Sequence, residues 1–149
     1  MDLLSLAAGR RDAGLAALDD GARADLGQFL TPIEVARLMA ALPRLPRQGV
    51  LRVLDPGAGS GVLSAAVVDR VRREAPDLRL EVTAVEVDER LHGVLARTLD
   101  SLEDVGVRTT LVRDDFVNWA LGTDERFDLV IQNPPYRKIR SGSAPDRDL

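Results

Sequence analysis

The repeated alternation of short apolar runs with helical stretches is the feature that most constrains this fold. Four apolar runs span residues 50–54, 80–85, 107–112 and 127–132, and helical patterns at 62–74, 89–103 and 117–121 separate them. Strands and helices that alternate at this spacing are typical of a parallel sheet joined by crossover helices. Because the runs are apolar almost throughout, we expect helices to cover both faces of the sheet. The sequence therefore predicts an α/β fold with about four parallel strands.

Residues 1–46 are predicted to be an N-terminal helical segment, and residues 47–149 to be the sheet-containing core. The first 26 residues suggest one or two short helices. Thr31, Pro32 and Glu34 have the spacing of a capping box, with Thr31 as the N-cap of a helix that runs to about Leu42. The apolar residues that share one face of this helix are Val35, Leu38, Met39 and Leu42. In the helix at 89–103 we expect Leu91, Val94, Leu95, Thr98 and Leu102 to face inward.

The composition excludes several classes of site. A length of 149 residues suits one domain. The chain has no cysteine, which excludes disulfides, zinc–thiolate sites, iron–sulfur clusters and cysteine nucleophiles. His92 is the single histidine, so a multi-histidine metal site is also excluded and no metal is expected. The net charge of −4 argues against a chain whose whole surface grips nucleic acid, although a local basic face is compatible with it.

The sequence carries no sign of a membrane segment. No apolar run approaches the ~18–20 residues that a membrane span needs. The first residues lack the basic and long apolar regions of a secretory signal. We therefore expect a cytoplasmic protein without membrane contact.

A glycine-rich loop follows the first predicted strand. In an open parallel sheet, ligands bind beyond the carboxyl ends of the strands, which is where Asp55 and the loop at 57–61 lie. Its glycines allow the backbone to approach a ligand closely at the start of a helix. The spacing G-x-G-x-G differs from the dinucleotide fingerprint, and the Walker lysine is absent, so binding of a pyrophosphate or a P-loop nucleotide is disfavoured. The alternative is a tight turn without a ligand, in which Asp55 caps the helix.

The second and third predicted strands also end in acidic residues. Glu86 is placed to accept hydrogen bonds from the ribose hydroxyls of a nucleoside, and Val87 beside it to line an adenine. Asp115 offers a carboxylate to an exocyclic amine, and Phe116 offers a ring face to a purine. The alternatives are a solvated acid at Glu86, and Asp115 as a helix cap with Phe116 in the core.

The fourth predicted strand ends in the most distinctive element, Asn133-Pro134-Pro135-Tyr136. Two prolines stiffen the turn and leave carbonyl oxygens without a neighbouring N–H. The side-chain oxygen of Asn133 and the carbonyl of Pro134 then form a pair of acceptors that can hold an NH2 group, with its lone pair turned toward an electrophile. Tyr136 supplies a ring on which a planar base or amide can stack. The alternative is a plain proline turn.

In this order, the elements resemble those of the gamma class of S-adenosylmethionine-dependent N6-adenine DNA methyltransferases, found in bacterial restriction–modification systems. The matching segments are Gln-Phe-Leu-Thr-Pro at 28–32, Leu-Asp-Pro-Gly-Ala-Gly-Ser-Gly at 54–61, Val-Glu-Val-Asp at 85–88, Asp-Phe at 115–116 and the run that ends in Asn-Pro-Pro-Tyr at 127–136. The resemblance covers about residues 27–140. It implies a Rossmann-like sheet of the class I methyltransferase type, here incomplete.

The resemblance also implies roles for individual residues. Those implied to surround S-adenosylmethionine are Phe29, Thr31, Pro32, Asp55, Gly57, Ala58, Gly59, Gly61, Glu86, Val87, Asp115 and Phe116. Those implied to be catalytic are Asn133, Pro134, Pro135 and Tyr136, with Tyr136 stacking on an adenine flipped out of double-stranded DNA. Methyl transfer is then a direct displacement that needs neither a metal nor a covalent enzyme intermediate.

The chain differs from this family in its length. Family members continue well past the Asn-Pro-Pro-Tyr motif, with further strands and usually a target-recognition region. The resemblance therefore implies a truncated core with an exposed strand edge. It also implies that this core needs a C-terminal region or a separate subunit to recognise DNA. Positive charge at Arg137, Lys138, Arg140 and Arg147 lies beside the predicted target pocket, where phosphate would pass, or belongs to a solvated basic tail.

Two alternative functions stay open at this point. Similar motifs occur in enzymes that methylate the glutamine amide of release factors or guanine N2 in RNA, although residues 28–32 favour the DNA group. The second alternative is a non-catalytic module that binds cofactor, or only folds, and contacts a partner.

Overall fold

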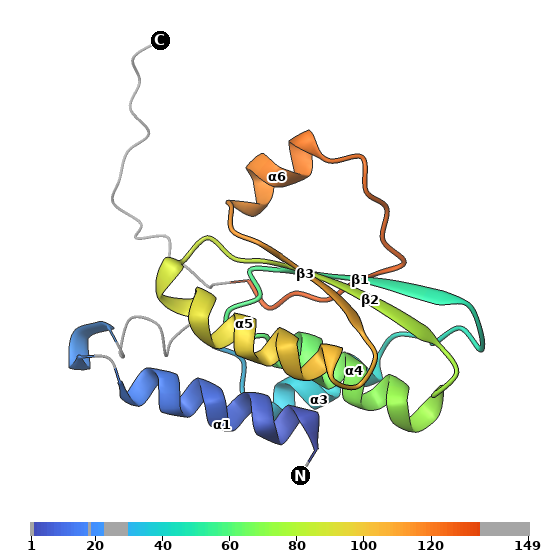
Figure 1. Cartoon of the computed structure of the whole chain (residues 1–149), viewed down its shortest axis with the longest axis horizontal. Coiled ribbons are helices and arrows are strands. Elements are labelled where there is room, and N and C mark those ends of the chain that lie inside the picture. The colour runs from blue at the N-terminus through green and yellow to red at the C-terminus, as the bar shows by residue number, and fades with distance from the viewer. Residues whose placement is uncertain (1, 18, 23–29, 135–149) are drawn as a thin grey trace, which may run out of the picture.

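A computed structural model describes residues 2–17, 19–22 and 30–134. Its four strands are parallel and form one sheet in the order β3-β2-β1-β4. The strands are β1 (Val50–Pro56), β2 (Arg79–Val85), β3 (Arg108–Val112) and β4 (Leu129–Val130). Between and before them lie the helices α1 (Leu3–Ala16), α3 (Ile33–Ala41), α4 (Val62–Glu74), α5 (Glu89–Glu103) and α6 (Phe116–Gly122). The prediction of a parallel α/β fold is thus confirmed (Figure 1).

The two crossover helices agree closely with the sequence pattern. α4 and α5 have the predicted bounds, and the predicted inward residues of α5 are all buried. α5 begins at the N-cap Asp88, whose carboxylate accepts from the backbone N–H of Arg90. Apolar periodicity therefore sets both helices, and α5 has in addition the local cap at Asp88.

Helices cover only one face of the sheet well, which corrects the expectation of two covered faces. α1, α3, α4 and α5 lie on one side, while α6 stands apart on the other and has no buried residue (Figure 1). Register places Arg52, Glu81 and Arg108 side by side on neighbouring strands. Glu81 pairs with Arg52 over 3.8 Å and with Arg108 over 2.6 Å. This row of charged side chains interrupts the apolar surface of one face of the sheet.

The N-terminal helices share one core with the sheet. Leu4 of α1 and Ala36 of α3 are fully buried and belong to the same apolar cluster as Val53 of β1 and Val82 of β2. Among the described residues, no helix is long and apolar enough to cross a membrane.

The capping box predicted at the start of α3 was wrong. The helix begins at Ile33 with Pro32 as its N-cap and no side-chain capping bond, so Thr31 and Glu34 form no capping box. Of the four apolar residues named on one face, Val35, Leu38 and Leu42 are exposed, whereas Met39 is partly buried against the core. α3 instead packs through Ala36 and Ala40, whose small side chains allow a close approach to α4.

β4 is shorter than the predicted run at 127–132. It pairs with β1 only over Leu129–Val130 and lies at the edge of the sheet. Two further backbone bonds extend the contact, from Asp128 N to the Arg52 carbonyl and from Ile131 N to the Leu54 carbonyl, each 2.9 Å long. The expected exposed edge is present within the described chain, and Val130 is 56% exposed.

Candidate functional site

The glycine loop between β1 and α4 is tied to the end of β2 by its backbone. The N–H groups of Gly57 and Ala58 both donate to the carbonyl of Val85, over 2.8 and 3.0 Å. Gly59 and Gly61 have positive φ values of 60° and 81°, which side chains rarely adopt. Beside Gly57, by contrast, no atom lies within 4 Å of the position that a Cβ would take. The loop thus leaves space for a ligand next to Gly57.

Asp55 lies at the end of β1 and is fully buried. Its Oδ2 accepts from Ser64 twice, from Oγ over 2.6 Å and from the backbone N over 3.1 Å. Within the described part of the chain, its Oδ1 is buried without any hydrogen-bond partner. Burial raises the pKa of Asp55 to about 6, the charge of Glu86 adds to the rise, and the bonds from Ser64 oppose it. A buried acceptor without a partner is a place where a donor from a ligand can bind.

Glu86 follows β2, and two backbone N–H groups fix its buried carboxylate. Oε2 accepts from Gly59 N over 2.7 Å, and Oε1 accepts from Asp88 N over 2.8 Å. Each carboxylate oxygen keeps one lone pair free of these bonds. Two acceptors held side by side at the carboxyl end of a strand can take the two hydroxyl groups of a diol.

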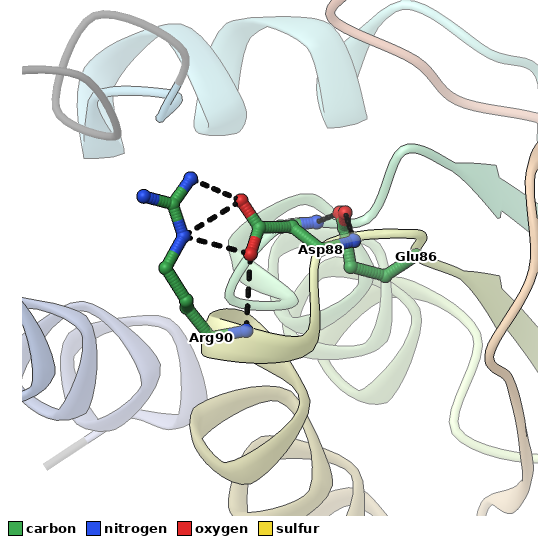
Figure 2. A network of polar contacts seen from close by, with 4 residues as sticks. Glu86, Asp88 and Arg90 are labelled. Carbon is green, nitrogen blue, oxygen red and sulfur yellow. Dashed lines mark hydrogen bonds and ion pairs between the residues drawn. The ribbon is translucent and has the colours of Figure 1, made fainter. Parts of the chain in front are cut away.

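Asp88 and Arg90 brace the segment that carries Glu86 (Figure 2). Nε of Arg90 donates to both carboxylate oxygens of Asp88, and Nη2 donates to Oδ2 over 2.6 Å. These hydrogen bonds are the main reason that the pKa of Asp88 is lowered. His92 adds a contact of 2.8 Å between its Nε2 and the carbonyl of Glu86. The sequence alone assigns no function to His92, and Asp88 and Arg90 belong to a charged run that is typical of a solvated surface.

Thr31 and Asn133 meet although 102 positions separate them in the chain. Nδ2 of Asn133 donates to Oγ1 of Thr31 over 3.1 Å. Thr31 is buried, Asn133 is half-buried, and the carbonyl-bearing Pro134 next to it is exposed. Leu30 in turn lies against the glycine loop, with Cδ2 at 3.1 Å from where a Cβ on Gly59 would be. Thr31 of the predicted closing element and Asn133 of the predicted catalytic motif are thus in contact, and Leu30, which precedes Thr31, lies against the glycine loop.

Asp115 is the N-cap of α6, and Phe116 is its first residue. The carboxylate of Asp115 caps this helix by accepting from the backbone N of Val117 and of Asn118. Phe116 is half-buried, and its ring centroid lies 6.4 Å from that of Trp119. The capping contact of the alternative interpretation is present, whereas a cofactor role for either residue stays a prediction.

The remaining predicted residues divide into two groups. Val87 is 63% exposed at the end of β2, and Pro32 is exposed at the start of α3. Phe29, Pro135 and Tyr136 lie outside the described residues, as do the four cations at 137–147. No cluster of three or more metal-ligating side chains occurs among the described residues.

Arg11 of α1 is a further contact that sequence analysis missed. Its Nη1 donates to the carbonyl of Thr31 over 2.8 Å. Next to it, a cavity of about 210 Å³ lies between α1 and α5 and reaches Ser60 of the glycine loop. The sequence gives little indication of this region, because α1 is brought next to the site only by tertiary packing.

Comparison with known proteins gives one family match. The model of the N-6 DNA methylase family matches residues 15–146. The chain is 36% identical over 136 residues to the type II methyltransferase M.BsuBI of Bacillus subtilis, a match that covers 81% of this chain and 26% of that protein. It is 29% identical over 141 residues to the type II methyltransferase M.PstI of Providencia stuartii, covering 87% of this chain and 27% of that protein. The chain therefore spans about a quarter of the length of these type II relatives.

RNA methyltransferases also match, over a shorter stretch. The tRNA1(Val) (adenine(37)-N6)-methyltransferase of Salmonella arizonae is 36% identical over 91 residues. This match covers 61% of this chain and 35% of that enzyme. The chain is thus similar to enzymes that are named for adenine N6 in a tRNA as well as to type II methyltransferases.

Solved structures support the fold. A Listeria monocytogenes chain described as a class I S-adenosylmethionine-dependent methyltransferase superposes with a TM-score of 0.57 at 22% identity, covering 78% of this chain and 33% of that one. A type I restriction–modification methyltransferase subunit from Streptococcus thermophilus gives a TM-score of 0.54 at 30% identity, covering 73% and 24%. The fold is that of the class I S-adenosylmethionine-dependent methyltransferases, as the sequence predicted.

Proposed function

The chain belongs to the N-6 DNA methylase family, and from this premise we propose that it is the cofactor-binding and catalytic part of an S-adenosylmethionine-dependent adenine-N6 DNA methyltransferase. The similarity to two type II methyltransferases supports a role in restriction–modification. On this proposal, residues 47–149 are the methyltransferase core, and residues 1–46 supply the element that closes over the cofactor.

The fixed carboxylate of Glu86 is the observation that carries the proposal. Backbone N–H groups of Gly59 and Asp88 hold one oxygen each, so the remaining lone pairs are oriented before any ligand arrives. That arrangement suits the two ribose hydroxyls of a nucleoside cofactor. Val87, exposed beside it, is the proposed contact for the adenine, and Asp115 and Phe116 are the proposed further contacts.

The other end of the cofactor fits the glycine loop. S-Adenosylmethionine carries an ammonium group and a carboxylate at its methionine end. The unpaired Oδ1 of Asp55 is an acceptor suited to a cation, and the open side of Gly57 leaves room beside it. The neighbouring residues Ala58, Gly59 and Gly61 complete the loop, and Phe29, Thr31 and Pro32 are the proposed closing element.

Asn133 and Pro134 are the proposed acceptors for the target amine. When bound, the cofactor supplies an electrophilic methyl group on a sulfonium. The side-chain oxygen of Asn133 and the carbonyl of Pro134 would each accept one hydrogen of the NH2 group, which turns the nitrogen lone pair toward that methyl. Pro135 stiffens the turn, and Tyr136 stacks on the flipped adenine. These residues contribute orientation and charge placement and form no covalent bond.

DNA recognition on this proposal needs further polypeptide, either a C-terminal target-recognition region or a separate subunit. The open edge of β4 and the exposed apolar side chains of α3 are surfaces that such a part can cover. The partner is double-stranded DNA with one adenine flipped out, and the setting is the cytoplasm.

Cofactor binding is the first test of this proposal. We expect S-adenosylhomocysteine to bind the purified chain with a micromolar dissociation constant in calorimetric titration. Glu86→Gln removes the charge of the diol acceptor, and Gly59→Val forces a side chain into a position with positive φ beside Leu30. We expect each variant to weaken binding at least about tenfold, the effect of 1.4 kcal/mol.

Glu89→Gln is the matched control, because Glu89 is an exposed acid three residues after Glu86. It should bind as the wild type does. A folded wild-type chain without saturable binding would refute the cofactor site.

RNA is the second candidate substrate, because an enzyme named for adenine-37 N6 of a tRNA matches 61% of this chain. In the presence of the proposed target-recognition polypeptide, methyl transfer to an adenine-containing DNA duplex should exceed transfer to tRNA. Faster methylation of tRNA would instead favour RNA as the substrate.

A further inference from the structure

The amide of Asn133 is anchored by a residue far from it in the sequence. Its Nδ2 donates to Oγ1 of Thr31 over 3.1 Å. Thr31 is only 8% exposed, so water competes little for this hydrogen bond. An amide is planar, with its nitrogen and oxygen on opposite sides. When Nδ2 faces Thr31, Oδ1 therefore faces away from it.

The turn that carries Thr31 is itself held in place. Nη1 of Arg11 donates to the carbonyl of Thr31 over 2.8 Å, and the Arg11 side chain is only 15% exposed. Pro32 follows with its φ fixed at −61°. Nε of Arg11 binds Asp12 over 2.8 Å, which limits the movement of the guanidinium group. These contacts hold the turn, and with it the hydroxyl of Thr31, in one position relative to α1.

We propose that Thr31 is a positioning residue that holds the Asn133 amide with Nδ2 toward the protein and Oδ1 outward as an acceptor. The inference rests on the proposed function, in which Oδ1 accepts a hydrogen of the target amine. The opposite orientation would place the Asn133 NH2 group against the target NH2 group, two donors facing each other. The role of Thr31 is therefore to favour the productive orientation of the amide.

The hydroxyl of Thr31 also makes this orientation sensitive to cofactor. In the structure this hydroxyl accepts from Nδ2 of Asn133, and a hydroxyl can also donate a hydrogen bond of its own. On the proposed function Thr31 belongs to the element that closes over the cofactor. A hydrogen bond donated by its hydroxyl to the cofactor would leave that hydroxyl only as an acceptor for Asn133, and the orientation with Nδ2 toward Thr31 would then be the one that keeps the hydrogen bond. Thr31 then links the cofactor half of the site to the target half.

Selective labelling with 15N-asparagine gives a direct test. The sequence contains only two asparagines, Asn118 and Asn133, so the spectrum holds two side-chain amide pairs. Asn118 lies exposed on α6 and serves as an internal reference. Thr31→Val removes the hydroxyl with little change in shape, and Thr31→Ser keeps it. Thr109→Val is the matched control, because it removes a hydroxyl that bonds Glu103 at the surface.

We expect Thr31→Val to shift the Asn133 pair and to raise its exchange rate with water roughly fivefold, as the loss of one hydrogen bond implies. Thr31→Ser and Thr109→Val should leave that rate close to the wild-type value. Addition of S-adenosylhomocysteine should slow the exchange further in the wild type but not in Thr31→Val. The Asn118 pair should not change in any variant.

An unchanged Asn133 pair in folded Thr31→Val would overturn the inference. So would a wild type that binds S-adenosylhomocysteine in calorimetry without any response at Asn133. Absence of binding in calorimetry overturns the proposed function by itself. The exchange difference between Thr31→Val and the wild type would still support the Thr31–Asn133 contact in that case.

Discussion

The carboxyl group of Asp55 lies in the core, where its ionised form is costly. It is fully buried, and only one of its two oxygens is bonded within the described chain. Burial raises its pKa from 3.8 to about 6, which corresponds to about 3 kcal/mol of destabilisation when the group is ionised at pH 7. An ionised carboxyl group in this position lowers the free energy of unfolding of the protein without ligand. Its cost is understandable if a cationic ligand group compensates it on binding.

The sign of this effect on stability follows from proton binding. Between pH 3.8 and about 6, Asp55 binds more protons in the folded state than in the unfolded state. Its contribution to the free energy of unfolding therefore rises as the pH falls through this window. We expect the stability of the wild type relative to Asp55→Asn to rise by up to about 3 kcal/mol between pH 7 and pH 4.

Urea denaturation of both proteins across this pH range measures the difference. The exposed Asp77→Asn is the control for the loss of one negative charge. A pH-independent difference between the wild type and Asp55→Asn would contradict the raised pKa.

The packing of α5 against the start of α4 determines which residue can occupy the end of the glycine loop. Gly61 is the N-cap of α4, has φ of 81°, and lies against α5. A Cβ at this position would come within 2.9 Å of Cγ2 of Thr98 and 3.0 Å of Cδ1 of Leu95. Backbone conformation and helix packing therefore require glycine at the same position.

Gly61→Ala should lower the free energy of unfolding by at least about 2 kcal/mol, the sum of left-handed backbone strain and overpacking. Gly93→Ala is the matched control within α5, where the nearest atom to the new Cβ, Nη1 of Arg97, is 3.8 Å away. We expect this control to be stabilised by up to about 1 kcal/mol, because alanine favours a helix interior. Chemical denaturation of both variants provides the measurement, and equal stability would contradict the packing argument.

The two sides of the sheet differ in how much apolar surface is buried against them. Four helices pack into one core on one side, whereas α6 has no buried residue on the other. Trp119, the only tryptophan, lies on α6 between Phe116 and Phe127, with ring centroids 6.4 and 6.1 Å away. A short helix with so few tertiary contacts opens more readily than the core.

We therefore expect tryptophan fluorescence to change at lower urea concentration than the helical circular dichroism signal. Phe127→Ala should lower the fluorescence midpoint further and leave the dichroism midpoint nearly unchanged. Val71→Ala, in the fully buried core, should instead lower the dichroism midpoint. Coincident transitions in the wild type would show that α6 unfolds together with the core.

Much of the fold was predictable because its signals are local. The bounds of α4 and α5 follow from apolar periodicity, the glycine loop and the Asp88 cap, all of which act within a few residues. The parallel sheet follows from the alternation of strands and helices. The closeness of Asp55, the glycine loop and Glu86 follows in turn, since the carboxyl ends of neighbouring parallel strands meet at one edge.

The same local rules failed at Thr31 and α3. The spacing of Thr31 and Glu34 is that of a capping box, but the Thr31 hydroxyl accepts from Asn133 and caps nothing. Most of the larger apolar residues on one face of this helix are exposed, because close packing on α4 buries Ala36 and Ala40. A periodicity shows that a helix has two faces, and the neighbouring helix decides which one is buried.

The sequence by itself determined the order of the elements and the chemical groups that each strand end carries, because backbone preferences and apolar periodicity act between near neighbours. The tertiary structure alone decided which of those groups touch. It turned the amide of Asn133 toward Thr31, set Arg11 behind that turn, and used backbone N–H groups to fix Glu86. These contacts join residues up to 102 positions apart, and such residues meet only once the chain has packed.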